Sequence, residues 1–152
     1  MKLRLAGFLD DSLVNGDGLR SVVFVSGCSH NCAGCHNIEM QSHHYGEEVE
    51  AEDIFNRIKD NIIVRGVTFS GGEPMDQAEA LCELAEKIKS HGLNLWCYTG
   101  YTYEQILEGT DENKKKLLSY VDVLVDGQYI EELKEGASKY TGSRNQRIIK
   151  LK

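Results

Sequence analysis

The sequence of 152 residues is short of several features that mark other classes of protein. It has a single proline, so no stretch resembles a proline-rich linker between domains. No apolar run approaches the roughly 20 residues that a membrane-spanning helix needs. The opening MKLRLAGFLDD has neither the apolar centre nor the small-residue cleavage site of a secretion signal. We therefore expect one domain spanning residues 1–152, located in the cytoplasm and not in a membrane.

The charge balance is acidic, with a formal net charge of −7 at pH 7. Such a surface repels phosphate backbones, so we do not expect nucleic acid as a partner. The exception is the stretch 139–152, which has five basic residues and no acidic one. The composition is otherwise typical of a globular protein, with 41% hydrophobic and 27% charged residues.

Short β-branched runs alternate with amphipathic stretches along the chain, which predicts an α/β fold. The clearest helix places on one face Ala78, Leu81, Cys82, Ala85 and Ile88. An earlier helix has Ile54, Ile58 and Ile62 near one face. The expected strands cover 19–27, 67–69, 93–100, 121–127 and 147–151, and the expected helices cover 50–61, 75–92, 102–109 and 129–135.

The order strand, helix, strand favours a parallel sheet with crossover helices. A closed eight-fold barrel usually needs about 250 residues, and this chain is too short for one. We therefore expect an open, partial (β/α) barrel of roughly five to six parallel strands. The cysteine-containing loop and the segments SGGEP, YTGY and VDGQY each follow a predicted strand. Because the carboxyl ends of parallel strands share one edge, these loops are expected to form one site.

The five cysteines are an odd number, which argues against a disulfide framework in a cytoplasmic chain. Three of them, Cys28, Cys32 and Cys35, lie in GCSHNCAGCHN with the spacing C-x3-C-x2-C. A cubic [4Fe-4S] cluster usually takes four cysteines, one for each iron. Three thiolates would leave one iron open for a substrate or cofactor. Cys82 and Cys97 lie in an apolar helix face and a strand, where small buried hydrophobes are expected.

Zinc is the alternative, because a structural zinc site requires four ligands. A histidine could complete a Cys3His set, and the candidates are His30, His36, His43 and His44.

Longer segments carry a resemblance to a known family. CSHNCAGC is similar to the cysteine signature of radical S-adenosylmethionine enzymes, and SGGEP is similar to their second motif. The segments NGDGLRSVVFVSGCSHNCAGCHN, TFSGGEPMDQ, WCYTGYTYEQI, VDVLVDGQY and GSRNQRI together resemble the anaerobic ribonucleoside-triphosphate reductase activating proteins. The resemblance covers nearly the whole chain.

This resemblance implies a [4Fe-4S] cluster held by the three clustered cysteines, with S-adenosylmethionine bound at the open iron. The implied cofactor contacts come from the cysteine loop, the glycine turn and two later strand ends: Gly34, Cys35, His36, Ser70, Gly71, Gly72, Glu73, Pro74, Thr99 and Asp126. Glycines let a backbone approach a ligand closely, and Pro74 restricts Glu73 to an extended conformation. His36 departs from the pattern, since relatives often carry tyrosine there.

The implied reaction is reductive cleavage of S-adenosylmethionine, followed by glycyl-radical formation on the anaerobic reductase. The implied electron donor is a small protein such as flavodoxin, and no separate catalytic acid or base is expected. Two alternatives stay open. One is activation of another glycyl-radical enzyme such as pyruvate formate-lyase, and the other is a non-enzymatic zinc-binding adaptor.

Overall fold

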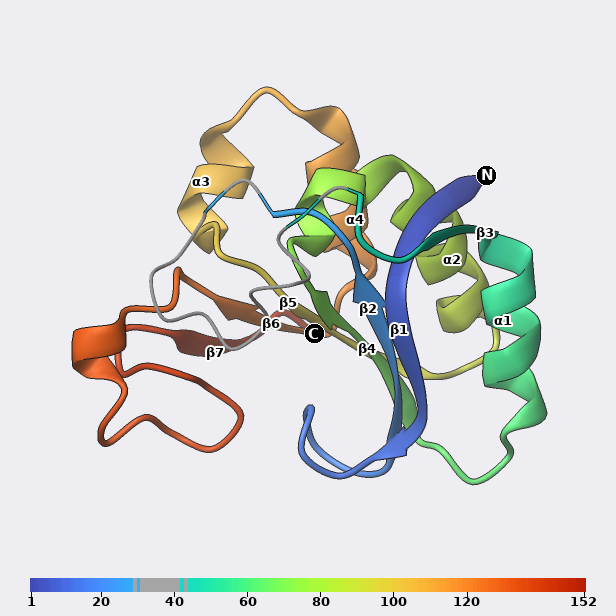
Figure 1. Ribbon diagram of the computed structural model, residues 1–152, viewed down its shortest axis with the longest axis horizontal. Helices are drawn as coiled ribbons and strands as arrows, with labels where there is room; N and C mark the ends of the chain where they lie inside the picture. Colours follow the sequence, from blue (N-terminus) through green and yellow to red (C-terminus); the bar gives the residue numbers. More distant parts are fainter. Residues whose placement is uncertain (29, 31–41, 43) are drawn as a thin grey trace.

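The computed structural model describes residues 1–28, 30, 42 and 44–152. Within these residues a single mixed sheet forms the centre of the molecule (Figure 1). Its strand order is β3-β1-β2-β4-β5-β6-β7. The strands are β1 (Lys2–Ser12), β2 (Arg20–Val25), β3 (Glu47–Glu50), β4 (Gly66–Gly71), β5 (Asn94–Tyr98), β6 (Val123–Asp126) and β7 (Arg147–Lys150).

Strands β2, β4, β5 and β6 are parallel and form the middle of the sheet. Strands β1, β3 and β7 run antiparallel to their neighbours. The expected partial barrel of five to six parallel strands is therefore wrong, because the sheet has seven strands and mixed directions. β1 and β3 were not predicted, and the predicted strand 147–151 pairs antiparallel at the edge as β7.

The connections explain the mixed directions. The segment 13–19 joins β1 to β2, and a short loop suffices for an antiparallel pair, whereas a parallel pair needs a long crossover. The parallel strands are indeed linked by helices: α1 (Ala51–Asp60) precedes β4, α2 (Ala78–Ser90) precedes β5, and α3 (Tyr103–Glu108) and α4 (Glu112–Tyr120) precede β6. No helix of the described segments is long and apolar enough to cross a membrane.

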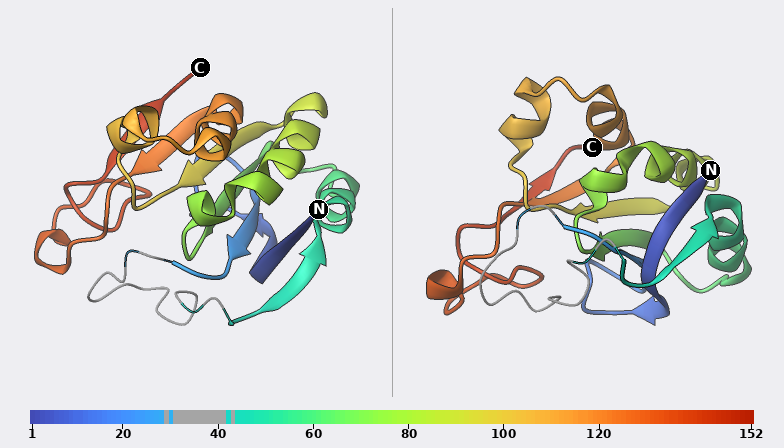
Figure 2. Two further views of the ribbon diagram at one scale, coloured as in Figure 1. Left: turned by 90° about the horizontal axis from the view of Figure 1, so that it is seen from above. Right: turned by 45° about the horizontal axis from the view of Figure 1, so that its top comes forward.

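The helices gather on one face of the sheet, as the left view of Figure 2 shows. Their apolar sides form the main core with Phe69 and Leu124 of the sheet. The predicted apolar face of α2 is buried throughout, and a capping box of Thr102 and Gln105 opens α3. Ile62 is an exception to the prediction: it lies beyond the end of α1 and is 91% exposed.

Among the described residues, the loops 13–19 and 127–146 pack against the opposite face of the sheet at Trp96. Trp96 of β5 belongs to a second apolar cluster there, whereas its neighbours Leu95 and Cys97 belong to the main core. This alternation is expected because successive side chains of a strand point to opposite faces. Tyr140, from the long segment after β6, packs against Trp96 with 5.4 Å between ring centroids. The predicted helix in that segment, 129–135, is only the 3-10 turn η3 (Glu131–Leu133).

Candidate functional site

A cavity of about 470 Å³ lies at the carboxyl ends of the parallel strands. This volume falls in the range of small-molecule sites. The residues that line it come from the carboxyl-terminal parts of the four parallel strands, from the loops that follow them and from the segment before β2: Val14, Asn15, Phe24, Cys28, His30, Ser70, Gly71, Gly72, Glu73, Tyr98, Thr99, Gly100, Val125, Gly127, Tyr129, Tyr140, Thr141, Gly142 and Gln146.

Cys28 is the clustered cysteine that the structure describes. It follows β2, is partly exposed and lines the cavity. The other predicted residues of the cysteine loop, Gly34, Cys32, Cys35 and His36, lie outside the described residues.

The remaining thiols lie elsewhere. Cys82 and Cys97 are both buried, and burial raises the pKa of each thiol. A raised pKa disfavours the thiolate that ligates metals. This placement agrees with their interpretation as small core residues.

The carboxyl end of β4 and the turn after it bring the predicted glycines to the cavity. Gly71 has φ +105, and a Cβ atom there would lie 2.5 Å from the backbone of Val25. Gly72 N donates to Val25 O at 2.8 Å, and Glu73 N donates to the oxygen of Gly27, next to Cys28, at 2.7 Å. Backbone contacts thus hold the glycine turn directly beside the start of the cysteine loop.

The carboxylate of Glu73 is buried, and its side chain is 1% exposed. Its Oε1 accepts from Gly100 N at 2.7 Å and contacts His30 Nε2 at 2.6 Å. Its Oε2 accepts from Thr99 Oγ1 at 2.8 Å and from Met75 N at 2.9 Å. A buried carboxylate needs such partners to offset the loss of hydration. Both oxygens therefore bind groups of the protein itself.

His30 completes this arrangement from within the cysteine loop. The neighbouring Glu73 raises the pKa of His30. The other ring nitrogen, Nδ1, lies 3.1 Å from Nε2 of Gln128, which follows β6. The ring also packs edge-on against Tyr101, with 4.4 Å between centroids. Because both ring nitrogens have protein partners, His30 is poorly placed to serve as the fourth ligand of a zinc site.

The two polar residues predicted at later strand ends have different positions. Thr99 lines the cavity, donates to Glu73 and accepts from Tyr101 N at 3.1 Å. Asp126 is 1% exposed and is not among the residues that line the cavity. Arg147 donates to its carboxylate through Nε at 3.0 Å and Nη2 at 2.5 Å. Tyr103 N donates to the same carboxylate at 2.7 Å.

Of the remaining predicted residues, Ser70 lines the cavity and Pro74 does not. Pro74 is the first residue of the 3-10 turn η2 (Pro74–Gln77). The preceding residue, Glu73, has the expected extended conformation, with φ −122 and ψ 103.

Part of the cavity lining was not predicted from the sequence. It is formed by Tyr129, Tyr140, Thr141, Gly142 and Gln146 from the segment after β6. Gln146 fixes this segment, since its Nε2 donates to Gly127 O at 2.9 Å and its Oε1 accepts from Gly142 N at 2.7 Å. The signal was present in GSRNQ, whose amide and hydroxyl side chains favour local backbone hydrogen bonds.

The segment NGDGLR lies beside the cavity, and its Asn15 is one of the lining residues. Arg20 is 2% exposed, and its guanidinium lies 5.5 Å from the ring centroid of Trp96. Burial lowers the pKa of Arg20 to about 10. Arg20 donates to Asp17 O at 2.7 Å and to Thr68 Oγ1 at 2.8 Å. A Cβ atom at Gly16 would lie 2.9 Å from the indole of Trp96, so glycine lets the loop pack against it.

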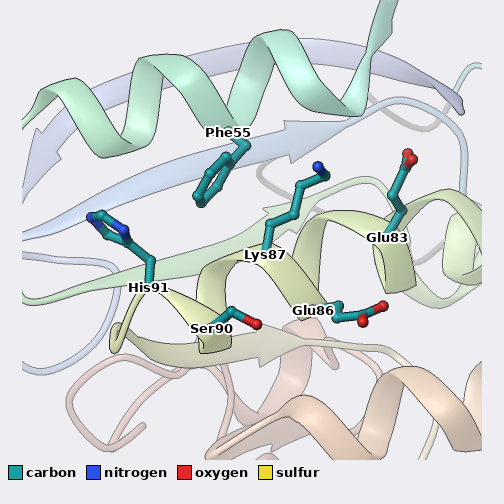
Figure 3. Close-up of a pocket in the computed structure, with 6 residues that line it drawn as sticks. All are labelled: Phe55, Glu83, Glu86, Lys87, Ser90 and His91. Carbon is teal, nitrogen blue, oxygen red and sulfur yellow. The ribbon is translucent and has the colours of Figure 1, made fainter.

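A second hollow lies on the helical face, between α1 and α2 (Figure 3). Phe55, Lys87 and His91 line it together with Glu83, Glu86 and Ser90. It contains none of the predicted site residues. The cavity at the strand ends is therefore the candidate site.

Comparison with known proteins agrees with the motifs. A family model described as a 4Fe-4S single cluster domain matches residues 14–149. An anaerobic ribonucleoside-triphosphate reductase-activating protein of Vibrio cholerae is 38% identical over 144 residues, covering 90% of each chain. Proteins with the same name from Haemophilus influenzae and Escherichia coli K12 are 35% and 30% identical, each over 148 residues. These alignments cover 92% of this chain and 93% and 94% of the relatives.

The family model and the alignments with the relatives each extend over most of the chain, and they agree with the resemblance that the motifs indicated. With its residues 14–149 matching the 4Fe-4S single cluster domain, the chain belongs to the family of anaerobic ribonucleoside-triphosphate reductase-activating proteins.

Proposed function

We propose that this chain activates an anaerobic ribonucleoside-triphosphate reductase, using a [4Fe-4S] cluster and S-adenosylmethionine. The relatives are named for this activity, and the family model is described by its cluster. The cavity at the strand ends is the observation that carries the proposal, because it joins a partly exposed cysteine to a glycine turn and a set of polar loops.

The cluster would be held by Cys28, Cys32 and Cys35. Cys28 borders the cavity, so a cluster on this loop would face it. The protein partners of both ring nitrogens of His30 favour three-thiolate ligation over a Cys3His set that uses this histidine. Three thiolates would leave one iron without a protein ligand, and S-adenosylmethionine would bind there.

S-adenosylmethionine would occupy the cavity itself. The backbone of Gly71 and Gly72 can approach the ligand closely because these residues have no side chain. Gly34, Cys35 and His36 would contact the ligand from the cysteine loop, and Ser70 and Thr99 would add hydroxyl contacts. Tyr129 and Tyr140 also line the cavity and would exclude water from the bound ligand.

When bound, the cluster would supply the electron that cleaves S-adenosylmethionine to methionine and a 5′-deoxyadenosyl radical, which removes a hydrogen atom from a glycine of the reductase. A small electron-transfer protein such as flavodoxin would reduce the site. The cavity is open at the end of the sheet, so a glycine-bearing loop of the reductase could cover it. Asp126 is bound by Arg147 and would act by supporting the strand end.

The test is anaerobic incubation of the iron-loaded chain with S-adenosylmethionine, a reductant and the reductase carrying deuterium at glycine Cα. We expect 5′-deoxyadenosine that contains deuterium, and a glycyl radical signal in electron spin resonance, only when the reductase is present. Product without deuterium would show that the glycine is not the hydrogen donor. The same signal with pyruvate formate-lyase alone would favour that partner. Zinc at one per chain, without cleavage, would favour the adaptor.

A further inference from the structure

We propose that His30 and Glu73 form a clasp that sets the position of the cysteine loop relative to the glycine turn. Both are positioning residues: the side chain of Glu73 would serve this clasp and not bind S-adenosylmethionine directly. The inference rests on the proposed function for its effect on S-adenosylmethionine, but the clasp itself is a property of the chain.

The clasp joins two segments that are far apart in the sequence. His30 lies two residues after Cys28 and two before Cys32, in the middle of the first cysteine spacing. Glu73 follows directly after the glycines of the turn. The 2.6 Å contact between His30 Nε2 and Glu73 Oε1 therefore ties position 30, between the first two clustered cysteines, to the turn that would hold the cofactor.

The loop after β5 closes around the same pair. Gly100 N and Thr99 Oγ1 both donate to the Glu73 carboxylate. A Cβ atom at Gly100 would lie 2.5 Å from Cδ2 of His30, so only glycine lets this loop pack against the ring. Gln128 adds the loop after β6 through its contact with Nδ1. The clasp thus connects all four strand-end loops.

Burial makes the loss of either partner in the clasp costly. The side chains of His30 and Glu73 are 7% and 1% exposed, so water cannot readily replace a lost partner. A buried acceptor without its donor is costly, and the loops would shift to satisfy it. Such a shift would separate the glycine turn from the segment that carries His30 without removing any of the three clustered thiols.

The experiment compares five variants of the full chain: His30→Ala, His30→Gln, Glu73→Gln, the double variant His30→Ala/Glu73→Gln, and Asp122→Asn. Glutamine at position 30 keeps a donor near the position of Nε2. Asp122 is the matched control, since it is a buried carboxylate just before β6 that accepts from Leu95 N at 2.8 Å and pairs with Lys89. Iron content, the electron spin resonance spectrum of the reduced cluster and the affinity for S-adenosylmethionine are measured for each.

We expect His30→Ala and Glu73→Gln to load iron like the unmodified chain. Their affinity for S-adenosylmethionine should fall by at least about tenfold, the effect of one lost buried hydrogen bond. The spectral change that S-adenosylmethionine causes in the unmodified chain should be lost as well. His30→Gln should recover most of the affinity, and Asp122→Asn should keep it.

Three results would overturn the clasp. Unchanged affinity in both His30→Ala and Glu73→Gln would remove its role in positioning. Iron loss in His30→Ala as severe as in Cys28→Ala would make His30 a metal ligand. An equal loss of affinity in Asp122→Asn would show that the effect is general destabilisation.

Melting temperatures separate this inference from the proposed function. If the two residues are coupled, the double variant should lose less than the sum of the two single losses. Additive losses would show that no clasp exists. If the iron-loaded unmodified chain does not bind S-adenosylmethionine, the proposed function fails, and the coupling still decides whether the clasp exists.

Discussion

The two faces of the sheet bury different kinds of side chain. The helical face is apolar: Ile58, Leu84 and Ile88 of the helices pack against the sheet, and all are buried completely. The loop face carries the guanidinium of Arg20 in a network with Thr68. Apolar packing tolerates small adjustments, whereas hydrogen bonds depend on direction and distance. The helical face therefore supplies stability, and the loop face and its strand ends supply the geometry of the site.

The largest expected effect separates the clustered cysteines at the strand ends from the core cysteines. Replacing Cys28, Cys32 or Cys35 singly by alanine should remove a cluster ligand and abolish cleavage of S-adenosylmethionine. Cys82→Ala and Cys97→Ala should retain the cluster and cost about 1 kcal/mol of stability. Iron content and 5′-deoxyadenosine yield are measured for all five. Loss of the cluster in Cys97→Ala with retention in Cys32→Ala would contradict the assignment.

A substitution that leaves a void in the apolar core tests the role of the helical face. Leu84→Ala should lower the free energy of unfolding by about 2–5 kcal/mol, because Leu84 lies on the apolar face of α2 and is buried completely. The folded fraction should bind S-adenosylmethionine as the unmodified chain does. Denaturant unfolding and ligand titration at low temperature provide the two measurements. A tenfold loss of affinity in the folded fraction would show that the two faces are not independent.

Two glycines with positive φ allow a matched comparison between the site and the helical face. Gly92 follows α2, and a Cβ atom there would have no neighbour within 4 Å. Gly92→Ala should therefore lower the free energy of unfolding by about 1 kcal/mol from backbone strain alone. Gly71→Ala adds a clash with Val25 to the same strain and should cost more. It should also weaken S-adenosylmethionine binding. Equal melting temperatures of the two variants would contradict the close approach of the turn to β2.

The smallest effect on the binding of S-adenosylmethionine is expected at Asp126. Its carboxylate accepts from Arg147 and Tyr103, so Asp126→Asn should lower stability while changing the affinity for S-adenosylmethionine by less than about threefold. Calorimetric titration of the iron-loaded variant measures the affinity. A loss of affinity as large as that of Glu73→Gln would instead place Asp126 among the ligand-binding residues.

The sequence alone was sufficient for the elements with a strong local pattern. The β-branched runs of β2 and β6 and the apolar face of α2 were predicted, because each pattern lies within one continuous stretch. The motifs also indicated the family, which the relatives confirm. The prediction that the loops after β2, β4, β5 and β6 meet at one edge follows from parallel pairing alone, and the cavity lies there.

Tertiary structure decided the features that depend on distant residues. The segment KLRLAGFLDDS does not reveal from its own pattern that it pairs antiparallel with both β2 and β3. The sequence likewise could not show which partner each buried carboxylate takes. Glu73 contacts His30 across 43 positions, and Asp126 accepts from Arg147 across 21. Hydrogen-bond partners are chosen by position in space, and only the folded sheet brings these side chains within reach of one another.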